Sequence, residues 1–155
     1  SELFPQVTAY CYTDNNPIKY KDPDGNRKWP VNTTYKGASR HIDSWYGPRN
    51  ISYGSKFHRG LDIANYLGAT VRASQRGKVV FAGFSGSYGN VVIIDHKGGY
   101  QTRYAHLLKP LVSVSQIVDK NEAIGLMGST GNSTGSHVHF EILKNGQLID
   151  PEDEL

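Results

Sequence analysis

The 155-residue sequence predicts an all-β fold, an antiparallel β-sandwich or a partly open barrel, and three observations indicate it. Short apolar stretches recur from residue 68 onward and are separated by glycine-containing turns, a spacing typical of sandwiches and barrels. The chain contains 17 glycines and 10 tyrosines, a composition that favours turns and strands. The sequence shows no long stretch with the periodicity of an amphipathic helix.

The first expected strands follow an amino-terminal stretch, residues 1–50. Turn and breaker signals are so dense there that we expect irregular structure. Residues 70–73 and 77–83 are each short stretches of strand length. Asn90–Asp95 is apolar on both faces, and we therefore expect it to be a central, buried strand.

The remaining strands are expected in the second half of the chain. Lys97–Gly99 marks a turn, and alternation then predicts a strand with four side chains on one face: Tyr100, Thr102, Tyr104 and His106. Two further strands are expected over residues 123–127 and 137–143. Asn145-Gly146 predicts a tight hairpin into a last strand at 147–149.

Two histidine-containing segments carry the candidate metal chemistry. Residues two apart share a face of a strand, so His137 and His139 project together while the apolar residues beside them anchor the other face. An extended segment at 58–62 would likewise put His58 and Asp62 on one side, and Gly60 would leave room for a metal or a substrate backbone. Two imidazoles and one carboxylate make a three-ligand zinc site with an open fourth position.

Spare imidazoles are also available, in His106 and in His137 beside His139, and either could move a proton at neutral pH. Spacing alone leaves surface histidines as the alternative to a metal site. The single cysteine, Cys11, excludes a cysteine-rich metal site and an internal disulfide, and we expect it to be a small packing residue.

Three segments resemble the motifs of the lysostaphin-type, LytM-like family of zinc metalloendopeptidases (family-23 metallopeptidases): His58–Ala64, Tyr104–Leu107 and Gly128–Glu141. The resemblance covers residues 42–150, with the motifs in the right order, and includes 77–83 and 88–96. It implies a LytM-type fold (a duplicated hybrid motif) and an enzyme that cuts peptide bonds of bacterial peptidoglycan.

Carried over by position, the resemblance implies one Zn²⁺ per chain, with His58, Asp62 and His139 as its ligands. His106 and His137 would be the non-ligand catalytic histidines, which orient or deprotonate the attacking water and steady the oxyanion. Three tyrosines near the motifs are candidates for lining a substrate groove: Tyr53, Tyr88 and Tyr104.

The chain departs from the family pattern in the stretch before Ile124, where the family usually has glycine. Ser115 and Asn121 lie in that stretch instead. Asparagine tolerates a left-handed backbone, so the turn can survive at Asn121, whereas Ser115 is less easily accommodated. Neither departure touches a candidate ligand.

The amino-terminal segment 9–25 resembles the end of an Rhs-repeat-associated core, a shell that precedes a variable payload. The expected organisation is an Rhs-like segment at 1–25, a connector and the start of the peptidase domain at 26–50, and the zinc metallopeptidase domain at 51–155. This implies a secreted, periplasmic or cell-wall location and a shell or immunity partner. A turn-rich linker is the alternative.

Three other functions compete with a peptidase. A noncatalytic wall-binding or partner-binding module on the same fold would be favoured by loss of a ligand or a catalytic histidine, and none is lost. A biotinyl or lipoyl carrier needs a modifiable lysine at a hairpin tip, and residues 125–128 have none. A nucleic-acid-binding toxin is disfavoured because the net charge is only +3 and no basic stripe is present. No apolar run is long enough to insert into a membrane.

Overall fold

The computed structural model describes residues 29–31, 34–35, 38–39, 41–49 and 57–155. Cys11, Tyr53 and the Rhs-like segment lie outside the described residues. The described elements are, in order, β1 (Thr34–Tyr35), β2 (Ala38–Ser39), β3 (His41–Ser44), β4 (Gly47–Pro48), β5 (Phe57–His58), β6 (Leu61–Ala64), β7 (Thr70–Arg72), β8 (Gly77–Phe84), η2 (Gly86–Tyr88), β9 (Asn90–Asp95), η3 (Lys97–Gly99), β10 (Tyr100–Pro110), β11 (Ile117–Val118), β12 (Ala123–Met127), β13 (His137–Lys144), β14 (Gln147–Ile149) and η4 (Pro151–Glu154).

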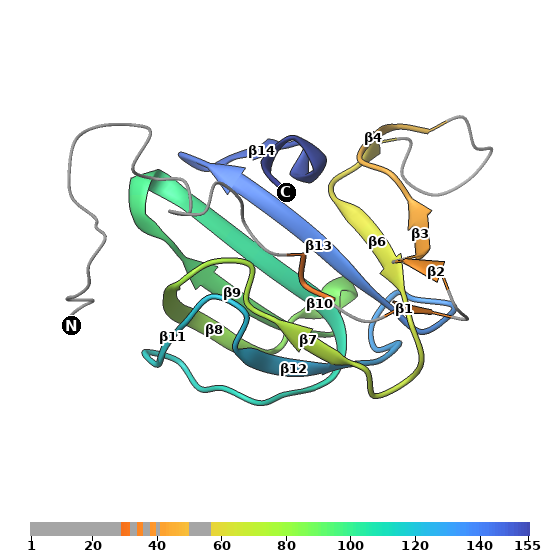
Figure 1. The fold of residues 1–155 in the computed structure, drawn as a ribbon, viewed down its shortest axis with the longest axis horizontal. Coiled ribbons are helices and arrows are strands. Elements are labelled where there is room, and N and C mark those ends of the chain that lie inside the picture. Colours follow the sequence, from red (N-terminus) through yellow and green to blue (C-terminus); the bar gives the residue numbers. More distant parts are fainter. Residues whose placement is uncertain (1–28, 32–33, 36–37, 40, 50–56) are drawn as a thin grey trace.

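One ten-stranded antiparallel sheet organises the molecule, in the order β11-β8-β9-β10-β13-β6-β3. β14 adds to β13, while β12 leaves this path, pairing with both β10 and β7. Figure 1 shows β10 and β13 crossing the middle of the molecule, with β7 and β12 forming a second layer. The predicted all-β fold is therefore confirmed, and the described helices are only short 3₁₀ turns.

The hydrophobic core lies between the main sheet and the β7–β12 pair. It takes Val71 from β7 and Ile124 from β12, and it takes Ile94 and Phe140 from the main sheet, all with no exposed surface. The alternation expected in strand 137–143 is the reason, since Val138, Phe140 and Ile142 all enter this core. Burial of that apolar face fixes β13, and with it the opposite, polar face.

The expected strands of the second half are confirmed, and three of them have the predicted bounds, β9, β12 and β14. The Asn145-Gly146 hairpin is also confirmed, because both residues have positive φ, 52° and 82°, as a type I′ turn requires. The expectation of irregular structure over 1–50 is wrong for part of that stretch. Four short strands, β1 to β4, lie within 34–48, and β3 pairs with β6. These strands form because they pair with neighbouring strands, and no apolar pattern in the sequence marks them.

Ser115 and Asn121 both have a left-handed backbone, with φ of 78° and 72°. Their amides donate to the carbonyls of Val79 and Ala73, so the turn persists without glycine. We expect Ser115→Gly to raise the free energy of unfolding by about 0.5–1 kcal/mol, because glycine relieves the strain of a positive φ. Thermal or urea unfolding measures this. Ser113→Gly, in the same exposed turn but without positive φ, should be neutral or slightly destabilising, and equal stabilisation by both would contradict the prediction.

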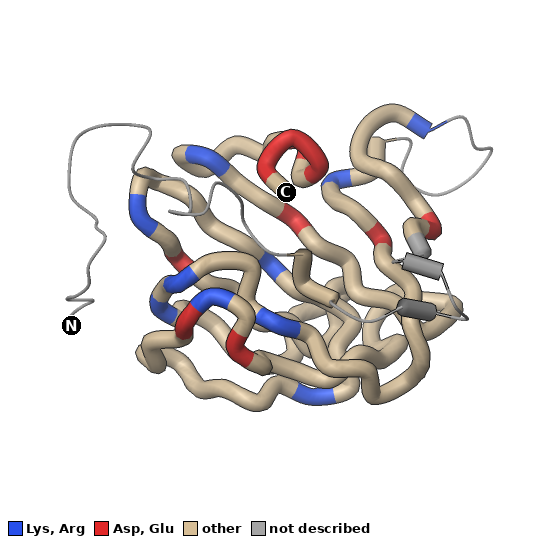
Figure 2. Tube along the Cα trace, viewed as in Figure 1, with Lys and Arg blue, Asp and Glu red and all other residues tan. Residues whose placement is uncertain are grey.

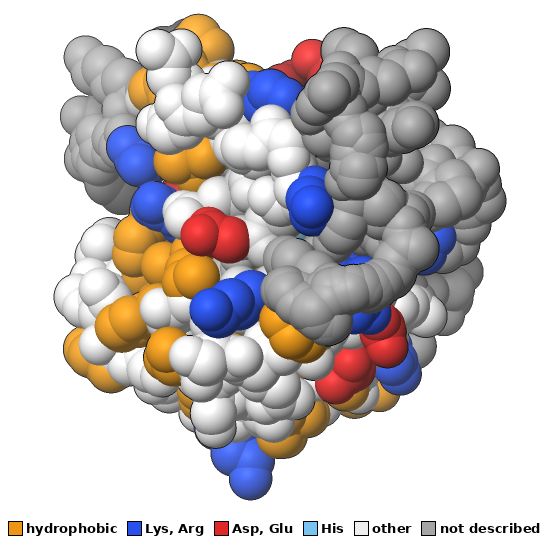
Figure 3. All heavy atoms as spheres, turned by 90° about the vertical axis from the view of Figure 1, so that its left-hand side faces the viewer, with side chains coloured by type: hydrophobic (Ala, Val, Ile, Leu, Met, Phe, Trp, Pro, Cys, Tyr) orange, Lys and Arg blue, Asp and Glu red, His pale blue; other side chains and the backbone are white. Residues whose placement is uncertain are grey.

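Charged side chains of both signs are spread along the described chain, with carboxylates gathered in the carboxy-terminal turn η4 (Figure 2). On the face shown in Figure 3, the lysine and arginine side chains of the described residues are separated by hydrophobic and neutral ones, so the described part of this face carries no continuous basic stripe. Within the described residues, no helix has the length and apolar character needed to cross a membrane.

Candidate active site

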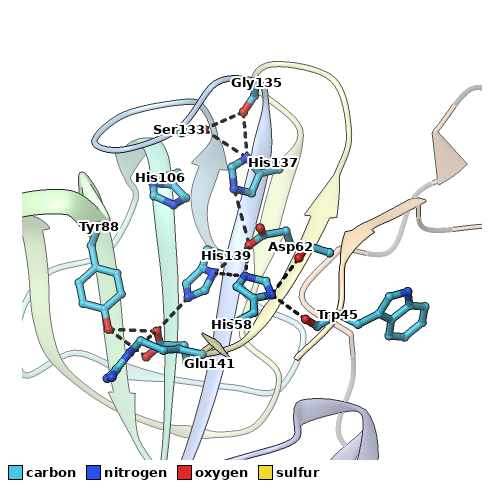
Figure 4. A network of polar contacts seen from close by, with 12 residues as sticks. Trp45, His58, Asp62, Tyr88, His106, Ser133, Gly135, His137, His139 and Glu141 are labelled. Carbon is cyan, nitrogen blue, oxygen red and sulfur yellow. Dashed lines mark hydrogen bonds and ion pairs between the residues drawn. The ribbon is translucent and has the colours of Figure 1, made fainter. Parts of the chain in front are cut away.

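Three side chains from three strands converge on one point: His58 at the end of β5, Asp62 in β6 and His139 in β13 (Figure 4). The pairing of Asp62 with His139 across β6 and β13 brings the two side chains together. His139 Nδ1 lies 2.8 Å from Asp62 Oδ1, and His58 Nε2 lies 3.1 Å from the same oxygen. The two imidazole nitrogens are 3.3 Å apart.

This triangle of donor atoms fits a zinc ion. A tetrahedral zinc with ligand bonds of about 2.0–2.1 Å separates its ligand atoms by about 3.3–3.4 Å. The three observed distances between donor atoms, 2.8, 3.1 and 3.3 Å, are at or slightly below that separation. Small rotations of the side chains therefore widen the triangle to the size that a zinc ion needs. Both imidazoles are buried, and two nitrogens with one carboxylate oxygen are a donor set that zinc prefers.

Each candidate imidazole ligand is oriented through its outer nitrogen. His58 Nδ1 donates to the backbone carbonyl of Trp45, at 2.8 Å, which leaves Nε2 facing the triangle. His139 is turned the other way, because its Nε2 lies 2.8 Å from Glu141 Oε2 and its Nδ1 faces the triangle. The sequence did not single out Trp45 or Glu141. Glu141 was detectable as a third polar residue on the His137 and His139 face, whereas a backbone carbonyl leaves no sequence signal.

His106 reaches the site through a break in the strand. β10 pairs Tyr104 with Phe140 and Ala105 with His139 of β13, and on its other side its pairing with β9 shifts register between Tyr104 and Leu107. At the shift His106 has a φ of 63°, a left-handed conformation that is rare outside glycine. The expectation that His106 shares a face with Tyr104 is therefore wrong, because the bulge turns it to the His139 side.

The rings of His106 and His137 lie together beside the triangle, with centroids 4.9 Å apart. His106 Nδ1 lies 2.7 Å from the carbonyl of Thr130, and His137 Nδ1 lies 2.9 Å from the carbonyl of Gly135. A carbonyl only accepts, so each neutral ring carries its proton on Nδ1 and offers an unprotonated Nε2. His137 Nε2 lies 3.7 Å from Asp62 Oδ1, so it faces the candidate metal site.

Burial lowers the pKa of His106, and nearby His137 and His139 lower it further, although the Thr130 carbonyl opposes them, so this imidazole is neutral at pH 7. Burial also lowers the pKa of His139. Its hydrogen bonds to Asp62 and Glu141 outweigh that effect and raise the pKa to about 9. Burial raises the pKa of Asp62, but hydrogen bonds to His139 and His58 hold it well below its usual range. Without metal, a proton on His139 therefore bridges to Asp62.

The raised pKa of His139 predicts a pH-dependent stability of the metal-free protein. Its pKa is about 9 when folded, against about 6.5 for an unfolded histidine. The stabilisation by the protonated ring should thus be complete below about pH 6.5 and disappear as the pH rises through about 9. Unfolding in a chelator from pH 5 to 10 measures this. Zinc-loaded protein is the control, because the metal replaces the proton. A metal-free protein that gains stability from pH 6.5 to 9 would contradict the prediction.

Two further expectations are corrected at this site. Tyr104 is fully buried, and its hydroxyl accepts from the Ser74 amide and the Thr102 hydroxyl in the core, so it cannot line a substrate groove. The space beside Gly60 does not hold a metal or a substrate, because a Cβ there would overlap the backbone carbonyl of Phe140 in the neighbouring strand. Gly60 therefore permits close approach of two strands.

The chain resembles known peptidases over most of its length. Residues 56–151 match peptidase family M23. The peptidoglycan DD-endopeptidase ShyA of Vibrio cholerae is 34% identical over 153 residues, which cover 93% of this chain and 34% of that protein. The chain thus spans about a third of the length of this relative.

Two solved structures share the fold. A zinc containing peptidase from Vibrio cholerae has a TM-score of 0.68 and 34% identity, covering 84% of this chain and 42% of that one. The catalytic domain of lysostaphin from Staphylococcus simulans also has a TM-score of 0.68, with 32% identity over 74% of this chain and 90% of that domain. The architecture, the histidine and aspartate cluster and these similarities agree, and the chain belongs to peptidase family M23.

Proposed function

We propose that this chain is a zinc endopeptidase domain that cleaves peptide bonds of bacterial peptidoglycan. The observation that carries the proposal is the convergence of three ligand atoms within 3.3 Å of one another beside two further imidazoles whose protons are fixed on Nδ1. A noncatalytic wall-binding module has no need of those two imidazoles. The named substrate of the Vibrio endopeptidase relative supports peptidoglycan as the substrate class.

In this proposal His58, Asp62 and His139 hold one zinc ion through Nε2, Oδ1 and Nδ1 respectively. Zinc supplies a Lewis acid that polarises a peptide carbonyl and lowers the pKa of water. The burial of His58 and His139 excludes bulk water from the ligand side of the site, which strengthens electrostatic interactions there.

His106 and His137 are the proposed proton carriers. A neutral ring with its proton on Nδ1 can accept a proton from the attacking water at Nε2. The protonated ring can then donate from Nε2 to the oxyanion or to the leaving amine. The Thr130 and Gly135 carbonyls fix the two rings, so neither needs to reorient between these steps.

A peptidoglycan substrate places the site of action outside the cytoplasm, so we propose a secreted, periplasmic or wall-associated domain. The Rhs-like segment at 9–25 supports a more specific proposal, that the domain is the payload of a larger delivered protein with a shell or immunity partner. Production of the chain with and without an export signal tests this. Lysis only with export, abolished by His137→Ala, supports a wall-directed payload, and absence of lysis on a susceptible wall contradicts it.

Digestion of purified peptidoglycan tests the enzymatic function directly. Zinc-loaded protein is incubated with walls of two chemotypes, one with glycine bridges and one with direct cross-links, and new amino termini are identified by mass spectrometry. We expect new termini from at least one chemotype and none after zinc is removed. Zinc-loaded protein that releases no termini from either wall would contradict the proposal.

A further inference from the structure

Glu141 is a fully buried carboxylate for which the proposed chemistry has no direct use. It lies on β13 two residues after His139 and on the same face, opposite Arg103 on β10. A charged group without exposed surface is costly to bury unless both its oxygens are satisfied. Its partners therefore indicate why the chain retains a carboxylate at this position.

The contacts of Glu141 with His139 and Tyr88 are shorter than its contacts with two arginines. Glu141 Oε2 lies 2.8 Å from His139 Nε2, and the Tyr88 hydroxyl lies 3.0 Å from each of the two carboxylate oxygens. The two arginines stand farther away, with Arg59 Nε at 3.5 Å and Arg103 Nη1 at 3.7 Å, and the Arg59 side chain is 54% exposed. The arrangement is thus centred on His139 and Tyr88 (Figure 4).

The element that carries Tyr88 is itself fixed. Tyr88 ends the short turn η2, and the amide of Asn132 donates to the carbonyl of Ser87 at 2.9 Å. Gly89 and Gly131 approach so closely that a Cβ on either would overlap the opposite backbone. Tyr88 is therefore held against the same loop whose carbonyls orient His106 and His137.

We propose that Glu141 and Tyr88 form a positioning pair for the metal ligand His139. Glu141 accepts the Nε2 proton of His139, which directs the Nδ1 lone pair at Asp62 and His58, and Tyr88 holds the carboxylate in that orientation. The inference rests on the proposed metal centre. It also assigns Tyr88, a candidate substrate contact, a role through its hydroxyl within the protein. A carboxylate behind an imidazole fixes its tautomer and increases its basicity as a ligand.

Zinc affinity of the full chain, measured by competition with a chelator, tests this pair. Glu141→Gln should weaken zinc binding about 10- to 100-fold, and Tyr88→Phe should weaken it by a smaller but measurable factor of up to about tenfold, because Tyr88 acts through Glu141. The double variant should be no weaker than Glu141→Gln alone, since both changes remove one unit. The visible spectrum of the cobalt-loaded protein should change in each variant, because it reports the geometry of the ligands.

Tyr104→Phe is the matched control. Tyr104 is also a tyrosine with a hydrogen-bonded hydroxyl, but its partners are Ser74 and Thr102 in the core. It should lower stability and leave zinc affinity and the cobalt spectrum unchanged. Zinc binding by Tyr88→Phe equal to wild type, or additive losses in the double variant, would overturn the proposal. A wild-type protein that retains no zinc would overturn the proposed metal centre. This result differs from a failure of the Glu141–Tyr88 pair, in which the wild-type protein still binds zinc.

Discussion

Replacement of His139 by alanine is expected to abolish zinc retention, from about one ion per chain to none after gel filtration. The change removes one of three ligand atoms, and the two that remain, on His58 and Asp62, cannot close a tetrahedral site alone. It also leaves the buried Glu141 carboxylate without its nearest partner, at 2.8 Å, so a loss of stability should accompany the loss of metal. Elemental analysis and thermal unfolding measure the two effects.

Two milder variants separate metal loss from misfolding. Asp62→Asn keeps the shape of the side chain and loses only its charge, while His58→Ala removes a ring whose outer nitrogen meets only neutral groups, Trp45 and Ser44. Both should fold and lose zinc. His137→Ala, two residues from His139 on the same face of β13, should keep it. A folded His139→Ala protein with full zinc occupancy would contradict the assignment of the ligands.

The strand pattern explains why so much of this site could be predicted from sequence. The period of two fixes which residues of 137–143 face the core, so burial of Val138, Phe140 and Ile142 leaves His137 and His139 no other direction. The Asn145-Gly146 turn then sets the register of the last hairpin. In this part of the chain the turn residues and the strand periodicity predict the same arrangement, and the structure has that arrangement.

Features that depend on contacts between distant segments could not be predicted in the same way. Alternation placed His106 with Tyr104, and only the register shift between Tyr104 and Leu107, where β10 pairs with β9, introduces the bulge that turns it. The prediction of one extended segment over 58–62 is also wrong in part, because β5 ends at His58 and β6 begins at Leu61. His58 and Asp62 nevertheless lie on the same side and contact each other. Such breaks come from pairing with other strands, which a single sequence does not display.

His106→Ala and His137→Ala are expected to keep zinc and the fold and to lose about 10²–10⁴-fold in turnover, the usual scale for a proton carrier or an oxyanion donor. Neither ring belongs to the triangle of donor atoms, and each is held through Nδ1 by a backbone carbonyl. Replacing either ring with alanine therefore removes a proton-accepting Nε2 without disturbing a metal ligand. Rates of peptide release from peptidoglycan, compared at equal zinc occupancy, measure the loss.

His96→Ala is the matched control for these two variants. His96 is also a buried histidine, but its nitrogens meet the Arg76 carbonyl and the Thr102 hydroxyl. Its loss should cost about 1–3 kcal/mol of stability and leave the turnover of the folded protein unchanged. Near-normal turnover in both His106→Ala and His137→Ala would contradict their role as proton carriers. Loss of zinc together with turnover in either variant would instead assign that ring to the metal centre, because a proton carrier acts without holding the ion.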